Sequence, residues 1–302
     1  MDDPYISTEA SNDFNRARFR EIMSKIINSL SPERGQLLSL QEVKDLIKPK
    51  RETYKGMATV PIEAIIGSEG RYQDFNQSFL PKHEHIRTRW ERVDKAHLNN
   101  IDLPPVKLYK MGDVYFVRDG NHRVSVAKIQ GAQMIDAEII ELSTEIKIEP
   151  WMTHKDLRNK VIEYERDRAY RKTELGKVIP KEELVFTETG RYLEVLKHIN
   201  VHKYFLNENK KDEIPFIEGG KSWYENLYKP IVDAIEYNNI LFKFPGRTKS
   251  DLYVWIIKHW GYLKKEKGSN VSIEHAVLDF AKRFGKGFIQ QIKDIFHRIF
   301  RK

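Results

Sequence analysis

Five consecutive residues, Asp119, Gly120, Asn121, His122 and Arg123, have the types and the position that phosphate chemistry needs. They lie between an apolar run typical of a strand and an amphipathic run typical of a helix. Because a helix N-terminus presents unpaired N–H groups and a partial positive charge, the turn opened by Gly120 favours phosphate binding. Arg123 could add a bidentate grip, and His122 could hold a proton. The alternative is that Asp119 or Asn121 only caps the helix, with Arg123 in solvent.

A second loop offers similar chemistry. Gly67, Ser68, Gly70 and Arg71 follow a β-branched run over 59–66. Glycines let a backbone approach an anion closely, although an ordinary glycine turn is the alternative. Two such loops in one α/β unit, each carrying an arginine, predict a single nucleotide-binding site built from both.

Catalysis at this site would need an acceptor, a general base and neutralisation of charge by arginine or Mg²⁺. His122 and Asp119 are the candidate catalytic residues, and Asp74 and Glu84 are further carboxylates near the first loop. Charged residues make up 32% of the chain, so any one of these carboxylates is more often a solvated surface group.

Two pairs of histidines are candidate metal ligands. His198 and His202 are one helical turn apart, and His83 and His85 flank Glu84. Neither pair has a third ligand at metal spacing, so we predict no metal site.

The elements that position these residues follow from hydrophobic periodicity and turn signals. The first half predicts helices over 13–30 and 40–47, a linker over 48–55, a strand over 59–66, a helix over 84–98, strands over 106–109 and 114–117, a helix over 124–129 and a strand over 135–142. The second half predicts helices over 153–176, 190–205, 222–238, 248–264, 272–284 and 288–300. We expect an N-terminal helical arm over 1–52, an α/β domain over 53–149 and a mostly α-helical domain over 150–302.

Composition excludes several classes of protein. The 302 residues carry 52 Lys and Arg against 44 Asp and Glu, a net charge of +8, and no cysteine. The absence of cysteine excludes disulfides, thiolate nucleophiles and iron–sulfur clusters. The first residues are acidic, and no apolar run reaches the roughly 18 residues of a membrane span, so we expect a cytoplasmic protein.

The order of features over about 58–142 resembles the ParB/sulfiredoxin fold, which ParB partition proteins, sulfiredoxins and free-serine kinases share. The shared pattern is a strand, a Gly/Arg loop, a helix, a Leu-Pro-Pro-Val strand, a hairpin and a Gly-Asn-His-Arg helix start. The resemblance implies an α/β (α+β) domain that binds nucleotide phosphates. By position, it assigns this role to Gly120, Asn121, His122 and Arg123, with the Arg71 loop as the other phosphate-contacting segment.

Departures from the family narrow the activity. Asn121 stands where sulfiredoxins have their reactive cysteine, so sulfinic-acid reduction is excluded. The acidic, doubly basic turn of ParB proteins and their later polar nucleotide box are absent, which disfavours CTP-gated DNA clamping. The segment Asp-Gly-Asn-His-Arg is closer to the Asp-Gly-His-His-Arg of free-serine kinases, with one histidine changed to Asn121.

Two functions remain open at this point. The first is a ParB-like regulator, such as a transcriptional regulator or another DNA-associated protein, controlled by ATP, ADP or CTP with or without Mg²⁺, and able to form a homodimer. The second is an enzyme that uses the same pocket, either a nucleotide-dependent small-molecule kinase or a nucleotide or nucleic-acid hydrolase. One fold hosts both behaviours.

DNA would contact the basic helical second half. Its cations and the aromatic residues among them are Lys264, Lys265, Lys267, Lys282, Arg283 and Lys286, with Trp255, Trp260 and Tyr262. Cations bind a phosphate backbone, and aromatic rings stack on bases. The alternative is that Trp255 and Ile256 belong to a core stripe and the lysines form a solvated face. The basic amphipathic segment 288–300 could dock on a partner or a membrane surface, or pack on its own domain.

Overall fold

The computed structural model describes residues 3–27, 35–208, 210–268 and 270–285. The chain divides into two compact units, Met1–Val161 and Ile162–Lys302, and the boundary falls inside the helix α5 (His154–Thr173). The expected arm over 1–52 and the expected α/β domain over 53–149 therefore lie in one unit. The unit with the sheet is called unit one below, and the helical unit is called unit two.

Unit one is built on a six-stranded mixed sheet in the order β1-β3-β5-β4-β6-β2. The strands are β1 (Leu38–Ser39), β2 (Glu52–Pro61), β3 (Ile65–Ser68), β4 (Val106–Met111), β5 (Val114–Asp119) and β6 (Met134–Leu142). β3 runs parallel to β1 and β5, and β4 runs parallel to β6. The antiparallel pairs are β4 with β5 and β2 with β6, and the first of these is the predicted hairpin around Gly112. The mixed α/β class is confirmed.

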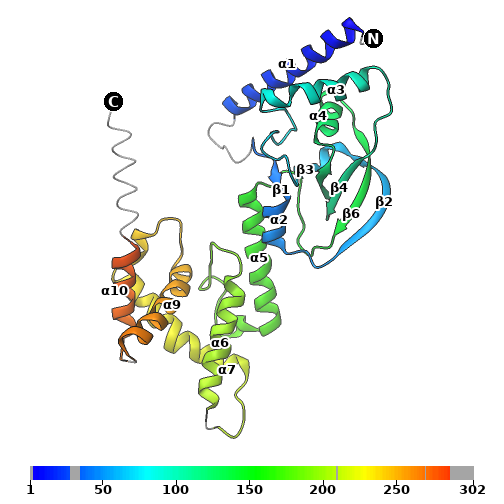
Figure 1. The fold of residues 1–302 in the computed structure, drawn as a ribbon. Helices are drawn as coiled ribbons and strands as arrows, with labels where there is room; N and C mark the ends of the chain where they lie inside the picture. The colour runs from blue at the N-terminus through cyan, green and yellow to red at the C-terminus, as the bar shows by residue number, and fades with distance from the viewer. Residues whose placement is uncertain (1–2, 28–34, 209, 269, 286–302) are drawn as a thin grey trace, which may run out of the picture. The chain divides into compact units, whose positions relative to one another are not determined.

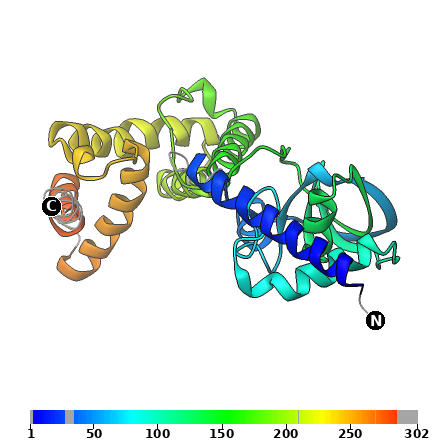
Figure 2. The same ribbon diagram turned by 90° about the horizontal axis from the view of Figure 1, so that it is seen from above.

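Helices cover both faces of the sheet. One face carries α1 (Pro4–Ile27), α3 (Arg87–Leu98) and α4 (Asn121–Ile129), and α1 lies along α3 in both ribbon views (Figures 1 and 2). The other face carries α2 (Leu40–Ile47) and the start of α5. Side chains alternate between the two cores, as strand geometry requires: Leu108 enters the α3 and α4 side, and Tyr109 enters the α2 side.

The predicted linker over 48–55 is wrong in its second half, because β2 already begins at Glu52. β2 is an edge strand, and Val60 is its one buried side chain. An edge strand exposed on both faces has no hydrophobic alternation, so periodicity does not detect it. The expected strand over 59–66 is instead the end of β2, a short 3₁₀ turn (Ile62–Ala64) and the first half of β3.

Two helices begin earlier than predicted. α1 starts at Pro4 rather than at 13, and its predicted last residues, 28–30, lie outside the described part of the chain. α4 starts at Asn121 rather than at 124. The helices expected over 40–47 and 84–98 are confirmed, the second as a 3₁₀ turn (Glu84–Ile86) that continues into α3.

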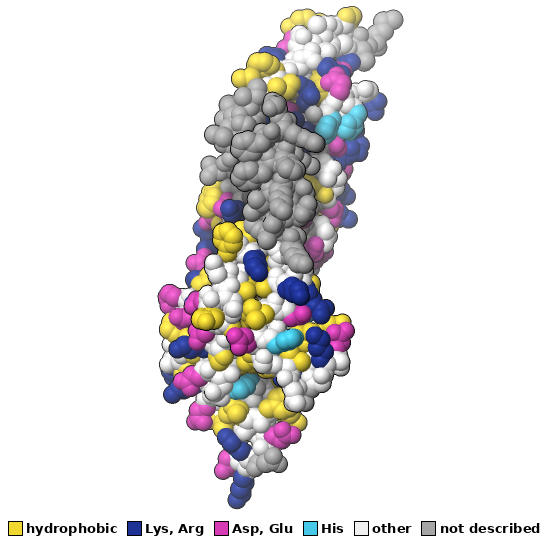
Figure 3. Space-filling view, turned by 90° about the vertical axis from the view of Figure 1, so that its left-hand side faces the viewer, with side chains coloured by type: hydrophobic (Ala, Val, Ile, Leu, Met, Phe, Trp, Pro, Cys, Tyr) yellow, Lys and Arg dark blue, Asp and Glu magenta, His cyan; other side chains and the backbone are white. Residues whose placement is uncertain are grey.

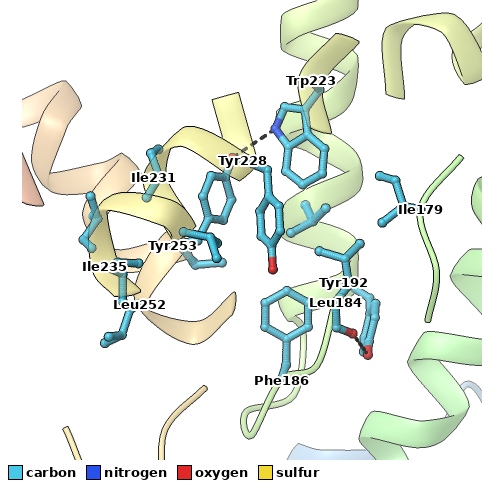
Figure 4. Close-up of a cluster of buried hydrophobic side chains, with 14 of the residues drawn as sticks. Ile179, Leu184, Phe186, Tyr192, Trp223, Tyr228, Ile231, Ile235, Leu252 and Tyr253 are labelled. Carbon is cyan, nitrogen blue, oxygen red and sulfur yellow. Dashed lines mark hydrogen bonds between the residues drawn. The ribbon is translucent and has the colours of Figure 1, made fainter. Parts of the chain in front are cut away.

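All of the regular secondary structure described for unit two is helical. After the end of α5 come α6 (Arg191–Asn207), α7 (Phe216–Trp223), α8 (Lys229–Tyr237), α9 (Lys249–Lys267) and α10 (Ile273–Phe284), with 3₁₀ turns at Leu175–Lys177 and Ile240–Lys243. A π-helical segment (Tyr224–Tyr228) joins α7 to α8, where a single helix over 222–238 was expected. The rings of Trp223, Tyr228 and Tyr253 lie together at the centre of its core (Figure 4).

The helices described above were compared with the length and hydropathy of a membrane-spanning helix. Over the described ranges, none of the helices joins the length and the apolar character that crossing a bilayer demands. The predicted segment 288–300 lies outside the described residues.

Candidate anion site at the start of α4

α4 begins without a side-chain cap. Gly120 occupies the N-cap position with a φ of 106°, a left-handed conformation that favours glycine. A Cβ there would lie 2.7 Å from Cγ1 of Val106. The alternative in which Asp119 or Asn121 caps the helix is therefore not what the structure has. The first N–H groups of α4 are not capped by a side chain, and the helix dipole favours an anion at this end.

The first two residues of α4 bury polar atoms without satisfying them. Asn121 is 7% exposed and His122 is 5% exposed. Oδ1 of Asn121 and Nδ1 of His122 are buried and have no hydrogen-bond partner among the residues described. An unsatisfied buried polar atom costs about 1–3 kcal/mol, so two neighbouring ones call for an explanation. A ligand that bonds to the first turn of α4 supplies one.

Positive charge surrounds His122. Burial and, to a lesser extent, the positive charges of Arg89 and Arg71 together lower the pKa of His122 to about 4, and the negative charge of Asp74 opposes this shift. The imidazole is therefore neutral at pH 7, with one ring nitrogen able to donate and the other able to accept. The two arginines act on the same point from the first loop and from α3, which is the electrostatic arrangement that an anion requires.

The loop that carries Arg71 contacts His122 through the ring of Phe75. An Arg71 Nη1 atom donates to Oδ2 of Asp74 at 2.9 Å, and Nε2 of His85 lies 3.5 Å from Oδ1 of the same carboxylate. The ring of Phe75 stands edge-on to the His122 ring with centroids 5.5 Å apart. Arg71 and Asp74 are thereby held beside the start of α4.

Backbone and side-chain bonds fix this loop in place. Oδ1 of Asn76 accepts from the N–H groups of Ser78 and Leu80, both at 3.0 Å. Phe79 has a φ of 57° although it is not glycine, and its carbonyl accepts from Oγ of Ser125 at 2.6 Å. Nε1 of Trp90 donates to the same Oγ at 2.8 Å. α3 and α4 therefore hold the loop in a conformation that its own sequence does not favour.

Three predicted residues of the first loop take other positions. Gly67 lies inside β3, and a Cβ there would meet the Phe116 ring at 2.3 Å, so glycine serves strand packing. Ser68 is fully buried, and its Oγ donates to the Val117 carbonyl at 3.3 Å. Gly70 has open space around it. Of the predicted first-loop residues, Arg71 is the one whose charge acts on His122.

The Arg123 guanidinium donates its hydrogen bonds to groups of the fold itself. Its Nη1 donates to the carbonyls of Pro104 and Pro105, the latter at 2.8 Å, and its Nη2 donates to Oδ2 of Asp119 at 2.6 Å. These bonds fasten the turn before α4 to the segment before β4. Asp119 is bound to Arg123, and the charges that shift the pKa of His122 are those of Arg89, Arg71 and Asp74. The structure does not join the candidate catalytic residues Asp119 and His122 by a bond.

Sequence reasoning missed three contributors. Arg89 lies inside the predicted helix over 84–98, but periodicity gave no reason to turn it toward His122. Phe75, which packs on His122, and Ser125, which holds the Phe79 carbonyl, also had no local signal. A pairing of Ser125 with Trp90 needs the relative position of α3 and α4, which no single-helix pattern contains.

Two of the basic residues expected to contact DNA interact with side chains of unit two itself. Nζ of Lys264 lies 3.6 Å above the Trp260 ring, and Arg283 pairs with Asp279 at 2.8 Å. On the face in Figure 3, Lys and Arg side chains are interspersed with Asp and Glu side chains. The core-stripe interpretation is confirmed for Ile256, which is fully buried, and Trp255 packs against the same core. Lys286 lies outside the described residues.

The remaining motifs take structural positions. The segment 215–222 is similar in composition to a P-loop, but it forms nearly all of α7. Ser222 lies inside this helix, with its Oγ 3.0 Å from Nε2 of His202. Within the described ranges, no group of three or more His, Asp or Glu side chains is arranged to hold a metal ion.

Comparison with known proteins gives a distant likeness. No family model matches the chain, and no curated protein matches it. The solved structure of a pNOB8-like ParB N-domain is similar to it, with a TM-score of 0.22 and 15% identity over 83% of this chain and 92% of that chain. A TM-score this low carries no conclusion about the site, which rests on the residues of this chain alone.

Proposed function

We propose that this protein binds the phosphate groups of a nucleotide at the start of α4 and acts as a nucleotide-controlled regulator or DNA-associated protein. One observation carries the proposal. Two successive residues, Asn121 and His122, bury unpartnered polar atoms at an uncapped helix N-terminus where the charges of Arg71 and Arg89 converge. Helix N-termini with adjacent arginines bind phosphates by N–H donation and by charge.

Each group has a defined role in this proposal. The first N–H groups of α4 donate to phosphate oxygens, and Arg71 and Arg89 neutralise the charge of the ligand. The amide of Asn121 can turn to present its Nδ2 as a donor. Neutral His122 donates from Nδ1 in one tautomer. Arg123 stays with its carbonyl partners and holds the turn rather than the ligand.

Binding is better supported than catalysis. A base with a pKa of about 4 is a weak proton acceptor at pH 7, and Asp119 is already paired with Arg123. The kinase or hydrolase alternative would therefore need an acid–base pair other than His122 and Asp119. If the protein turned over ATP or CTP, and His122→Gln abolished turnover while nucleotide binding was retained, the enzymatic alternative would be supported.

Titration calorimetry with ATP, ADP and CTP, with and without Mg²⁺, tests the proposal. We expect Arg89→Ala to weaken binding at least tenfold, because it removes one of two positive charges at His122. Arg92→Ala is the matched control: Arg92 is exposed on the same helix, and we expect its effect to stay within twofold. Equal effects of the two variants, or no binding of any nucleotide by the unaltered protein, would contradict the site.

The DNA part of the proposal has its own test. A phosphate-backbone contact predicts an affinity for duplex DNA that falls steeply as salt rises. Lys265→Ala combined with Lys267→Ala should lower both the affinity and the slope, because both side chains are exposed at the end of α9. An affinity unchanged between low and high salt would remove DNA from the list of partners.

A further inference from the structure

Two arginine–aspartate pairs flank the start of α4, and they differ in what else binds the arginine. Arg123 bonds Asp119 and also two backbone carbonyls, and its side chain is 16% exposed. For Arg71, the described residues give the guanidinium one hydrogen bond, to Asp74, and the side chain is 45% exposed. Arg123 is fixed by its surroundings, whereas Arg71 can change partner.

We propose that Asp74 is a built-in competitor of the ligand: its carboxylate occupies Arg71 in the free protein, and a phosphate dianion binds by taking Arg71 over. This inference rests on the proposed phosphate site and adds how that site is regulated. A carboxylate and a phosphate present similar oxygens to a guanidinium, and both bind it through parallel N–H···O bonds.

The exchange is inexpensive for the protein. The Arg71 side chain of this ion pair is 45% exposed and the Asp74 side chain is 17% exposed, so solvent screens the attraction at the arginine end, and releasing Arg71 costs little. Asp74 does not lose every partner, because Nε2 of His85 lies 3.5 Å from its Oδ1. Its backbone also stays bonded, with its N–H donating to the Arg71 carbonyl at 3.1 Å and its carbonyl accepting from Lys82 at 2.8 Å. The loop therefore keeps its shape while one side chain moves.

The charge of Asp74 acts on the same residue as the charges of the two arginines. Its charge acts on His122 in the sense opposite to those of Arg71 and Arg89. The next residue, Phe75, packs its ring edge-on against His122. The competitor, the exchanged arginine and the unpartnered Nδ1 atom of His122 thus belong to one site. The ligand must carry enough charge to displace a carboxylate, which selects a phosphate dianion over a carboxylic acid.

A double-mutant cycle measured with pyrophosphate on the full chain tests this competition. We expect Asp74→Asn to tighten pyrophosphate binding about fivefold, the equivalent of one surface ion pair. Asp113→Asn is the control, because it removes the same charge from an exposed carboxylate in the turn between β4 and β5, and we expect a change below twofold. In an Arg71→Ala background, Asp74→Asn should give little further gain.

The possible results separate this inference from the proposed function. If Asp74→Asn tightens binding equally with and without Arg71, Asp74 merely repels the ligand, and the exchange is overturned. Pyrophosphate binding by the unaltered protein that Arg89→Ala weakens but Asp74→Asn does not improve overturns the exchange and leaves the phosphate site intact. If neither the unaltered protein nor any variant binds pyrophosphate, the proposed function fails together with the inference. Equal thermal unfolding midpoints of the variants exclude misfolding as a cause.

Discussion

The core of unit two and the start of α4 in unit one bury polar side chains in opposite ways. In the core of unit two, Nε1 of Trp223 donates to the Tyr253 hydroxyl at 3.0 Å (Figure 4). The Tyr228 hydroxyl donates to the Glu183 carbonyl at 2.6 Å and lies 2.7 Å from Oγ of Ser250. At the start of α4 in unit one, Oδ1 of Asn121 and Nδ1 of His122 are buried and have no hydrogen-bond partner among the residues described.

The contrast separates polar groups that hold a fold from polar groups that wait for a ligand. A satisfied network stabilises its core and selects one packing arrangement, whereas unsatisfied groups cost free energy until something binds them. Burial raises the pKa of the Tyr228 and Tyr253 hydroxyls, which keeps both neutral. Burial lowers the pKa of His122, with the same effect on charge and without the bonds.

The largest predicted effect is a dependence of unit-one stability on pH. His122 has a pKa of about 4 when folded, against 6.5 in the unfolded chain, so between these values the unfolded state binds the additional proton. Stability from this group is therefore lost as the pH falls from about 6.5 to 4, by roughly 3 kcal/mol at most. His122→Gln should abolish this loss, as measured by amide hydrogen exchange over α3 and α4 corrected for intrinsic rates.

Asp94 supplies the opposing control in the same unit. Its burial raises its pKa to about 6, which the nearby charge of Asp13 reinforces and the bond from Gln130 opposes. Between about pH 4 and 6 the folded state holds the additional proton, so this group stabilises the fold as the pH falls. Asp94→Asn should therefore make the loss of stability at acid pH steeper, whereas His122→Gln removes that loss. Variants that shift the pH profile in the same direction would contradict the assignment.

The next effect sharpens the comparison on the side of unit two. Tyr228→Phe leaves the Glu183 carbonyl and Oγ of Ser250 without this partner in the core, and we expect a loss of about 2 kcal/mol in the free energy of unfolding. Tyr237→Phe is the control, because Tyr237 is 88% exposed and the variant removes a solvated hydroxyl. The free energy of unfolding of both variants is measured by chemical denaturation, with amide hydrogen exchange over α8 and α9 as the readout. Equal losses would show that the core network adds no stability.

Removing an unpartnered atom should have the opposite sign. Asn121→Leu replaces an unsatisfied amide by an apolar side chain of similar size, so we expect the stability of unit one to stay level or to rise by up to about 1 kcal/mol. Asn76→Leu is the matched control: Asn76 is 5% exposed, but its Oδ1 accepts two backbone bonds, and we expect a loss of about 2 kcal/mol. Amide exchange over α3 and α4 measures both. A comparable loss in both variants would mean that Asn121 is satisfied in solution.

The same contrast explains how far sequence reasoning reached. Periodicity and turn signals predicted the hairpin, α2 and α3, because each element carries its own hydrophobic pattern. Arg71 and His122 were predicted for the site because each lies beside a glycine-containing loop. Arg89 and Asp74 acquire their roles from the packing of α3 and the first loop against α4, which local patterns do not contain.

Arg123 shows what local reasoning leaves out. Its position one turn into α4 suggested a phosphate grip, and the nearby carbonyls of Pro104 and Pro105 instead take its donors. These carbonyls belong to a segment 18 and 19 residues earlier in the chain. An arginine beside a glycine turn therefore identifies a ligand contact only when no backbone carbonyl competes for its donors.

The smallest effect tests the unpartnered nitrogen directly. A dianion bound at the start of α4 would offset the positive charges of Arg71 and Arg89, so the pKa of His122 should rise from about 4 by one unit or more. Sulfate is the suitable probe, because it stays a dianion across this pH range and adds no titration of its own. An NMR titration of the histidine rings, with sulfate replaced by chloride at equal ionic strength as the control, measures the shift. If the His122 curve were the same in both salts, its buried nitrogen would not face an anion, and the difference between the two sites would be one of folding cost alone.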